Sequence, residues 1–340
     1  MTLAELVLAL MWVGLTAYAV FGGADFGAGF WDLFAGGPER GARQRTLIAE
    51  VIGPVWEVNH VWIIFVLVVL WTGFPAAFGA IMSTLYIPLT LVTFGIILRG
   101  SGFAFRKVAT TLELRRLWGA TFALSSVITP FFLGAVAGGV ASGRIPLGDD
   151  AGNAFTSWLN PTSMLGGGLA VGTCAFLAAT FLTREAYHRD DPEMIEVFRA
   201  RAIAAGVVTG AVALAGIAVI GFDAPALFEG LTERALPLVL LSGIGGLGAV
   251  ALLWKRRFVL ARVAAAAAVV AVVWGWAVGQ YPDVLVPDVE IADVAASRPT
   301  LQALLIVLAV GAVFLIPSLL WLYRLSEQGR LLESGPEPQT

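Results

Sequence analysis

Long apolar runs alternate with short polar connections along the whole chain. Each run has about 20 residues, enough to cross a bilayer as a helix. The nine runs are 3–24, 53–73, 77–98, 118–141, 162–183, 201–222, 235–254, 258–279 and 302–323. Runs of this length have no polar face, so a soluble protein with apolar core helices is the weaker interpretation. The pattern predicts an all-α polytopic membrane protein with nine transmembrane helices.

The second and third runs are nearly continuous, and Gly73-Phe74-Pro75 is the predicted break between them. Charge tests this count, because cytoplasmic connections are enriched in Lys and Arg. All but three of the 21 basic residues lie in alternate connections, with Arg99 counted in the connection after the third span. The exceptions are Arg144, Arg234 and Arg298. The pattern predicts an N-terminus outside the cell and a C-terminus in the cytoplasm.

Composition excludes some classes of partner and chemistry. The chain of 340 residues is 58% hydrophobic and 13% charged, and its net charge of −3 indicates no nucleic-acid partner. The single cysteine, Cys174, lies in an apolar run and is read as a packed small residue. Only His60 and His188 could offer imidazole ligands. We therefore predict no metal site and no haem held by this chain alone.

Asp25 is an ionisable residue within an apolar run, and such residues are functional candidates because hydrocarbon makes them costly. It lies at the predicted inner end of the first helix. Gly23 and Gly27 are four residues apart and form a small face that another helix can approach closely. We therefore expect Asp25 to lie in protein rather than lipid. The alternative is a carboxylate that only caps a helix end or binds interfacial water.

Glu57 and His60 are three residues apart, so they share one face of the second helix, with Asn59 on a neighbouring face. Desolvation raises the pKa of a buried Glu, and a His titrates near neutral pH. Together the two groups could pass protons through a dry region. Alternatively, Glu57 and His60 satisfy each other and hold two helices together. Trp56 and Trp62 flank the group and are read as interfacial anchors or packing residues.

Several motifs resemble subunit II of the cytochrome bd-type quinol oxidases. The most specific is Gly53-Pro54-Val55-Trp56-Glu57-Val58-Asn59-His60-Val61-Trp62, followed by Phe74-Pro75. Asp25-Phe26-Gly27-Ala28-Gly29 is similar to that family's first-helix motif. Further matches are Leu159-Asn160-Pro161, Tyr281-Pro282, Pro287 and Ala295-Ala296-Ser297. The resemblance therefore runs along nearly the whole chain.

The resemblance implies two four-helix bundles plus one peripheral ninth helix. The expected division is a first bundle at 1–141, an outer connection at 142–161, a second bundle at 162–279, an acidic outer loop at 280–301, the ninth helix at 302–323 and a cytoplasmic tail at 324–340. It also implies a multi-pass subunit of a bacterial inner membrane complex, a heterodimer with subunit I. That partner would hold the haems b and d, and quinol would be the substrate. A quinone in this subunit, a small extra subunit and membrane lipid are further candidates.

Carried over by position, Asp25 and Glu57 match family acids on a proton path from the cytoplasm, and Asn59 and His60 stand beside them. Trp62 matches a tryptophan near the family's proposed oxygen entrance, with Trp56 as a second candidate there or at the interface. The family often has a further acid where this chain has Gly22, and it has Asp in place of Glu57.

The leading interpretation is a non-haem subunit of a membrane quinol:oxygen oxidoreductase, not catalytic alone. It would support assembly and supply protons for oxygen reduction to water, which makes the enzyme electrogenic without pumping. The first alternative is a proton- or ion-coupled secondary transporter with Asp25 and Glu57 as coupling sites. The second is a purely structural membrane scaffold, if the acids are paired and dry.

Overall fold

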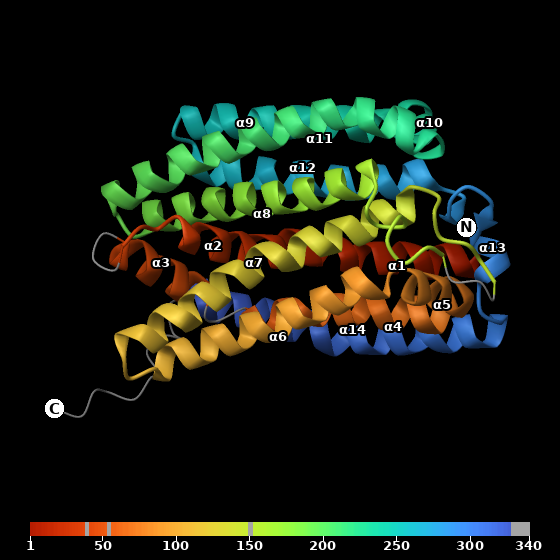
Figure 1. Ribbon diagram of the computed structural model, residues 1–340, viewed down its shortest axis with the longest axis horizontal. Helices are drawn as coiled ribbons and strands as arrows, with labels where there is room; N and C mark the ends of the chain where they lie inside the picture. The colour runs from red at the N-terminus through yellow and green to blue at the C-terminus, as the bar shows by residue number, and fades with distance from the viewer. Residues whose placement is uncertain (38–40, 53–55, 149–151, 328–340) are drawn as a thin grey trace.

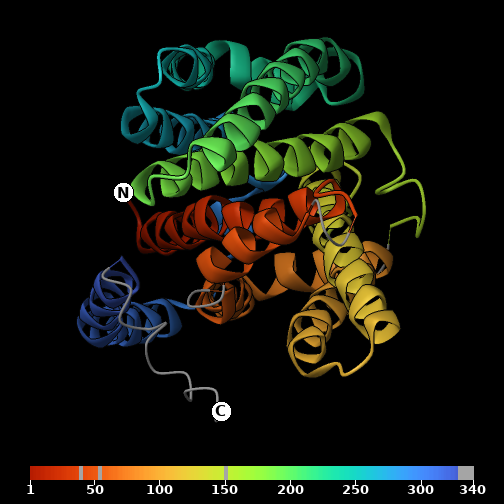
Figure 2. The same ribbon diagram turned by 90° about the vertical axis from the view of Figure 1, so that its left-hand side faces the viewer.

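The computed structural model describes residues 1–37, 41–52, 56–148 and 152–327, with side chains at all of these except positions 52, 56, 57, 323, 326 and 327. Long helices run side by side along one direction, and a two-stranded hairpin and several short helices cover one end (Figure 1). Turned by 90°, the same helices are seen closer to end-on as an elongated cluster (Figure 2).

The first group of helices surrounds the N-terminal segment. That segment is almost continuous, with a single π-helical turn, η1, set between α1 and α2. The group comprises α1 (Leu3–Ala17), η1 (Tyr18–Gly22), α2 (Gly23–Leu33), α3 (Ala42–Ile52), α4 (Trp56–Gly73), α5 (Pro75–Thr84), α6 (Tyr86–Val108) and α7 (Leu112–Ala141). Here α1 packs on α4, α6 packs on α7, and α2 packs on α7.

The second group packs against the first through α8, which contacts both α2 and α7. It comprises α8 (Pro161–His188), α9 (Pro192–Asp223), α10 (Pro225–Glu233), α11 (Leu236–Trp254) and α12 (Phe258–Gln280). After it come β1 (Asp283–Leu285), β2 (Val289–Glu290), α13 (Ile291–Val294) and α14 (Arg298–Glu327). Helix α14 lies at the edge of the cluster against α1 and α4 (Figure 2). This is the expected arrangement of two bundles and a peripheral helix.

The break at Phe74 is confirmed, but the span predicted at 77–98 is wrong. Pro75 begins the short helix α5, which is bent by 119° from α4, and the third long helix is α6. Phe74 has φ −140° and ψ 61°, outside the helical region, which is disfavoured for a residue before proline. Among the described residues, eight helices are long and apolar enough to span a membrane, and the bent pair α4–α5 is the ninth candidate. The all-helical polytopic fold is therefore confirmed.

The described connections separate by charge along the length of the molecule. The ends of α2, α6, α8 and α11 and the whole of α3 lie at one end, which we call the arginine-rich end (Figure 1, left). The chain's N-terminus, α5, α10 and the β1–β2 hairpin lie at the other end (Figure 1, right). The alternation expected from charge therefore corresponds to the path of the chain.

Close backbone contacts hold the two groups together. A Cβ atom at Gly27 of α2 would overlap the carbonyl of Cys174 in α8, so only glycine allows this approach. Gly23, one turn earlier, also faces α8. The small face predicted from these two glycines is thus confirmed, and it places α2 in the protein interior. Such contacts matter in a bilayer, where helix association depends on close packing rather than on exclusion of water.

Candidate functional site

A buried ion pair joins α2 to α6 in the middle of the first group of helices. Asp25 is 4% exposed and Arg99 is 1% exposed. The Arg99 Nη2 atom donates to Asp25 Oδ1 at 2.7 Å and to the Asp25 carbonyl at 3.2 Å. Arg99 Nε donates to the hydroxyl of Ser126 in α7 at 3.0 Å. Asp25 therefore lies in protein, as expected, and does not merely cap a helix end.

Aromatic rings enclose the same guanidinium. The Cζ atom of Arg99 lies 4.8 Å from the ring centroid of Phe26 and 5.0 Å from that of Phe122. Cation–π contacts of this kind are strongest where water is excluded. Gly29 supports the arrangement, since a Cβ atom there would overlap the Ser126 hydroxyl. The glycine-rich string after Asp25 thus brings both α7 and α8 close to the ion pair.

The position of Arg99 corrects the sequence interpretation. Arg99 was expected in a cytoplasmic connection, yet it lies within α6, which continues to Val108. Asp25 was expected at the inner end of its helix, yet α2 continues to Leu33, about 12 Å farther at the helical rise. Both helices extend beyond their apolar runs because each charge finds its partner inside the bundle.

A polar and aromatic cluster adjoins the pair on the side of α4. The ring of His60 lies 6.0 Å from that of Phe26 and 6.2 Å from that of Tyr18, centroid to centroid. Asn59 is buried, and its Nδ2 donates to the carbonyl of Phe21 in η1 at 3.4 Å. The structure therefore brings together three of the predicted residues, Asp25, Asn59 and His60.

The remaining predicted residues are Trp56, Glu57 and Trp62, all in α4. Trp62 is half-buried and packs against Tyr18, Phe26 and Cys174, with its ring 6.4 Å from that of Phe65. The side chains of Trp56 and Glu57 lie outside the described residues, although both positions belong to α4. The roles assigned to Glu57, Trp56 and Trp62 stay predictions.

A second carboxylate, Asp32, lies seven residues after Asp25 on the same face of α2. Its Oδ1 accepts from Arg45 Nε of α3 at 2.8 Å, and its Oδ2 accepts from Arg106 Nη1 of α6 at 2.5 Å. Arg106 in turn lies seven residues after Arg99. Helices α2 and α6 are therefore joined by two Asp–Arg rungs, about 10 Å apart at the helical rise.

Sequence reasoning missed Asp32, the true position of Arg99, and Tyr18. A signal was present, because Asp25 and Asp32 share the spacing of Arg99 and Arg106. The spacing alone does not identify partners that lie 74 residues apart.

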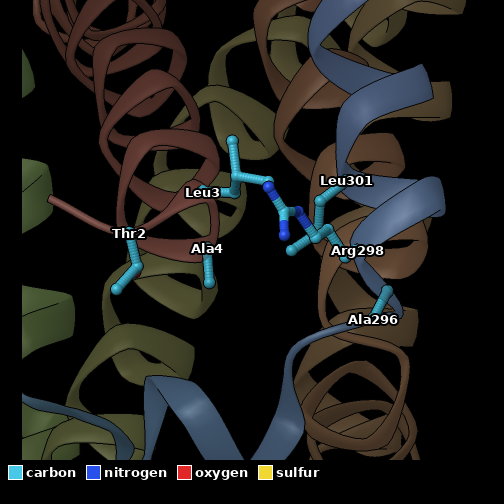
Figure 3. Close-up of a pocket in the computed structure, with 6 residues that line it drawn as sticks. All are labelled: Thr2, Leu3, Ala4, Ala296, Arg298 and Leu301. Atoms are coloured by element: carbon cyan, nitrogen blue, oxygen red, sulfur yellow. The ribbon is translucent and has the colours of Figure 1, made fainter.

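A shallow pocket lies elsewhere, between the start of α1 and the start of α14 (Figure 3). Its volume is about 380 Å³, and it is lined by Thr2, Leu3, Ala4, Ala296, Arg298 and Leu301. This pocket is at the end of the molecule opposite Asp32 and contains none of the predicted site residues. We place the candidate site at the Asp25 cluster, where buried charge and polar groups converge, and not in this pocket. Among the described residues, no group of three or more His, Cys, Asp or Glu is placed to hold a metal ion.

Comparison with known proteins identifies relatives along most of the chain. The profile described as cytochrome bd terminal oxidase subunit II matches residues 3–326. Cytochrome bd-I ubiquinol oxidase subunit 2 of Escherichia coli (strain K12) is 30% identical over 180 residues, 51% of this chain and 46% of that protein. Cytochrome bd ubiquinol oxidase subunit 2 of Bacillus subtilis (strain 168) is 29% identical over 180 residues, 52% of this chain and 51% of that protein. The chain thus aligns with about half the length of these relatives.

The fold has a counterpart among solved structures. The structure of bd oxidase from Geobacillus thermodenitrificans contains a chain with a TM-score of 0.80 and 25% sequence identity. The alignment covers 96% of this chain and 98% of that chain. The profile match spans all the helices described above, from the start of α1 to the last turn of α14. The chain therefore belongs to the cytochrome bd terminal oxidase subunit II family.

Proposed function

We propose that this chain is the non-haem subunit of a membrane quinol:oxygen oxidoreductase. The complex oxidises a quinol, reduces oxygen to water and takes the required protons from the cytoplasm. The printed names of relatives include ubiquinol and menaquinol oxidases, so quinol is proposed as a class. The partner is a haem-bearing subunit I that holds haems b and d. The arginine-rich end faces the cytoplasm in this proposal, in keeping with the enrichment of Arg and Lys in cytoplasmic connections.

The observation that carries the proposal is the polar cluster around Asp25, buried among membrane-spanning helices. Several of its buried atoms have no hydrogen-bond partner among the described residues: Asp25 Oδ2, Arg99 Nη1, Asn59 Oδ1, the Tyr18 hydroxyl and Trp62 Nε1. Buried polar atoms are nearly always hydrogen-bonded in native proteins, so each exception asks for an explanation. A cluster built to exchange hydrogen bonds with mobile protons and water explains them together.

The arrangement supports a proton path through Asp25, Glu57, Asn59 and His60. Arg99 Nη2 pairs with Asp25 Oδ1 and so orients the carboxylate, whereas Oδ2 has no hydrogen-bond partner among the described residues and is free to accept one. Asn59 anchors α4 to η1 and so fixes the distance between His60 and the ion pair. Glu57 precedes His60 by three residues in the sequence, and on this spacing we include it in the proposed path. A chain of such groups lets protons cross a low-dielectric region that bulk water does not enter.

One observation favours the structural scaffold as a second candidate. Asp25 is paired with Arg99, and paired, dry acids were the condition for that interpretation. The transporter has no comparable support among the described residues, because the bend between α4 and α5 lies at Phe74, at the opposite end from Asp32.

The test uses the complex purified through a tag on this chain, with its optical spectrum and its quinol oxidase rate as the two measurements. Glu57→Gln should slow turnover by about 100-fold, the usual contribution of a group that transfers a proton, and leave the haem spectrum intact. Glu113→Gln, in the exposed first turn of α7, is the matched control and should change neither. Unchanged turnover in Glu57→Gln removes the proton role of Glu57, and loss of the haem spectrum indicates a role in assembly. Absence of haem from the purified wild-type protein contradicts the oxidase itself.

A further inference from the structure

The π-helical turn η1 changes the direction of side chains next to Asp25. It covers Tyr18–Gly22, and the N–H of Gly23 donates back to the carbonyl of Tyr18 across this wider turn. A single π-turn inserts one residue into a helix and rotates the residues on either side relative to each other, and such turns are frequent at functional sites. Here it turns Tyr18 into the bundle, where its side chain is only 6% exposed.

The ring of Tyr18 fits a space that the neighbouring residues leave open. A Cβ atom at Gly22 would lie 3.0 Å from two of its ring carbons, so glycine at this position gives the ring its room. The ring packs edge-on against Phe26, with centroids 6.2 Å apart, and lies at the same centroid distance from His60, tilted by 49°. Phe26 links the ring to the ion pair, because the Cζ atom of Arg99 lies 4.8 Å from the centroid of the Phe26 ring.

Burial of the Tyr18 hydroxyl is unfavourable in free energy, whereas burial of the ring is favourable. The hydroxyl is fully buried and has no hydrogen-bond partner among the described residues. Burying a hydroxyl without a hydrogen-bond partner is unfavourable. Phenylalanine would fill the same space and avoid that penalty. The hydroxyl is therefore placed for a partner other than the described side chains.

We propose that the Tyr18 hydroxyl is a proton-relay group of this subunit, acting between the Asp25–Arg99 pair and His60. The proposal rests on the proposed function, because it adds a residue to that proton path. In one transfer, the phenol oxygen accepts a proton from a protonated water molecule on the Asp25 side and releases its own proton toward the imidazole of His60. The donor loses one O–H bond, the phenol gains one O–H bond and loses another, and the imidazole gains one N–H bond. The phenol stays neutral, and nothing is oxidised or reduced.

The test compares two variants of the intact haem-containing complex. Tyr18→Phe keeps the ring contacts with Phe26 and Gly22 and removes only the hydroxyl. Tyr86→Phe, at an exposed position at the start of α6, is the matched control. The measurements are the haem spectrum, the quinol oxidase rate across pH and the solvent deuterium isotope effect on that rate.

We expect Tyr18→Phe to retain the haem spectrum, to lower turnover by about tenfold and to raise the isotope effect. The loss of turnover is smaller than the loss expected for a group that transfers a proton directly to substrate. Tyr86→Phe should match wild type. A wild-type rate and isotope effect in Tyr18→Phe overturn the proposal. Loss of haem assembly in Tyr18→Phe also overturns it, because the hydroxyl then serves the fold.

A second pair of variants moves the ring and keeps the hydroxyl. Gly22→Ala displaces the Tyr18 ring, whereas Gly210→Ala in α9 meets no atom within 4 Å and is its control. The relay predicts slower turnover in Gly22→Ala and no additional slowing when Tyr18→Phe is combined with it. Independent, additive losses contradict the proposal. A wild-type complex that carries haem but oxidises no quinol refutes the proposed function separately from the role of Tyr18.

Discussion

The two Asp–Arg rungs between α2 and α6 have the same sequence spacing but different surroundings. The side chains of Asp25 and Arg99 are 2% and 1% exposed, and one arginine meets one carboxylate. Asp32 is nearly as buried, but its partners Arg45 and Arg106 are 24% and 30% exposed and stay in contact with solvent. The chain thus uses the same chemistry once in a closed interior and once at the arginine-rich end.

The difference shows that burial, rather than residue type, decides what such a pair contributes. Burying two charges carries a large desolvation penalty, which their mutual attraction offsets. Removing one partner therefore leaves the other charge buried and uncompensated. A pair with exposed partners gains little and loses little, because water replaces the missing group. A buried pair is therefore weak evidence for stability by itself.

Removing the cation of the buried rung should have the largest effect. Arg99→Gln leaves Asp25 charged among apolar helices, and we expect about 3–5 kcal/mol of destabilisation, enough to lower the yield of haem-containing complex severely. The measurement is the amount and melting temperature of the complex, followed by its haem spectrum.

The combined variant Asp25→Asn with Arg99→Gln separates stability from function. It removes both charges, so we expect assembly to recover while quinol oxidase turnover stays low. If Arg99→Gln alone is as stable as wild type, the pair is not dry in the membrane, and the contrast between the rungs does not hold.

Removing the carboxylate of the second rung should have a smaller effect. Asp32→Asn takes one partner from Arg45 and from Arg106, and both arginines then turn to solvent, so we expect about 1 kcal/mol or less. Raising the salt concentration should narrow the difference from wild type, because salt screens exposed charges. The measurement is the melting temperature of the complex at low and high salt. A loss as large as that of Arg99→Gln would show that the two rungs are energetically alike.

Much of this architecture follows from local sequence patterns, whereas the site depends on long-range pairing. Nine apolar runs predict nine helices, and all but the run at 77–98 coincide with long helices of the structure. Pro75 predicts the break after α4, and the Gly23–Gly27 spacing predicts the contact with α8. Hydropathy fails at Arg99 because a charge ends an apolar window whether or not it is paired. It also fails for α5, because an apolar segment that turns by 119° has the same composition as one that continues across the membrane.

The π-turn at Tyr18 is a further feature that periodicity does not reveal. One extra residue in a helical turn leaves the apolar run unbroken, so the run at 3–24 contains no sign of it. Only the fold brings Tyr18, His60 and Asp25 together. The role of Glu57, whose side chain lies outside the described residues, stays a prediction that the oxidase assay decides.

A third acid, Asp283 of β1, provides a reference without a carboxylate–arginine rung, and its effect should be the smallest. Burial raises the pKa of Asp283, and the nearby Glu290 and Asp288 carboxylates raise it further. Glu290 is its cross-strand neighbour in the hairpin. A carboxyl with a raised folded-state pKa contributes stability below its unfolded pKa of about 3.9 and loses that contribution as pH rises through the folded value.

Asp283→Asn should therefore stabilise the complex at pH 7 by roughly 0.3 kcal/mol, the scale of one like-charge cross-strand pair, and by less at pH 4. The melting temperatures of Asp283→Asn and of Glu233→Gln, an exposed acid at the same end, measured at both pH values, check this. A gain that is equal at the two pH values would mean that charge repulsion is not its cause. With Arg99→Gln and Asp32→Asn, this variant orders three acids by the environment of their charge. Removing the carboxylate is expected to stabilise the protein at Asp283 and to destabilise it at Asp32. This difference in sign would show that the arginine partners, rather than burial alone, decide what each carboxylate contributes.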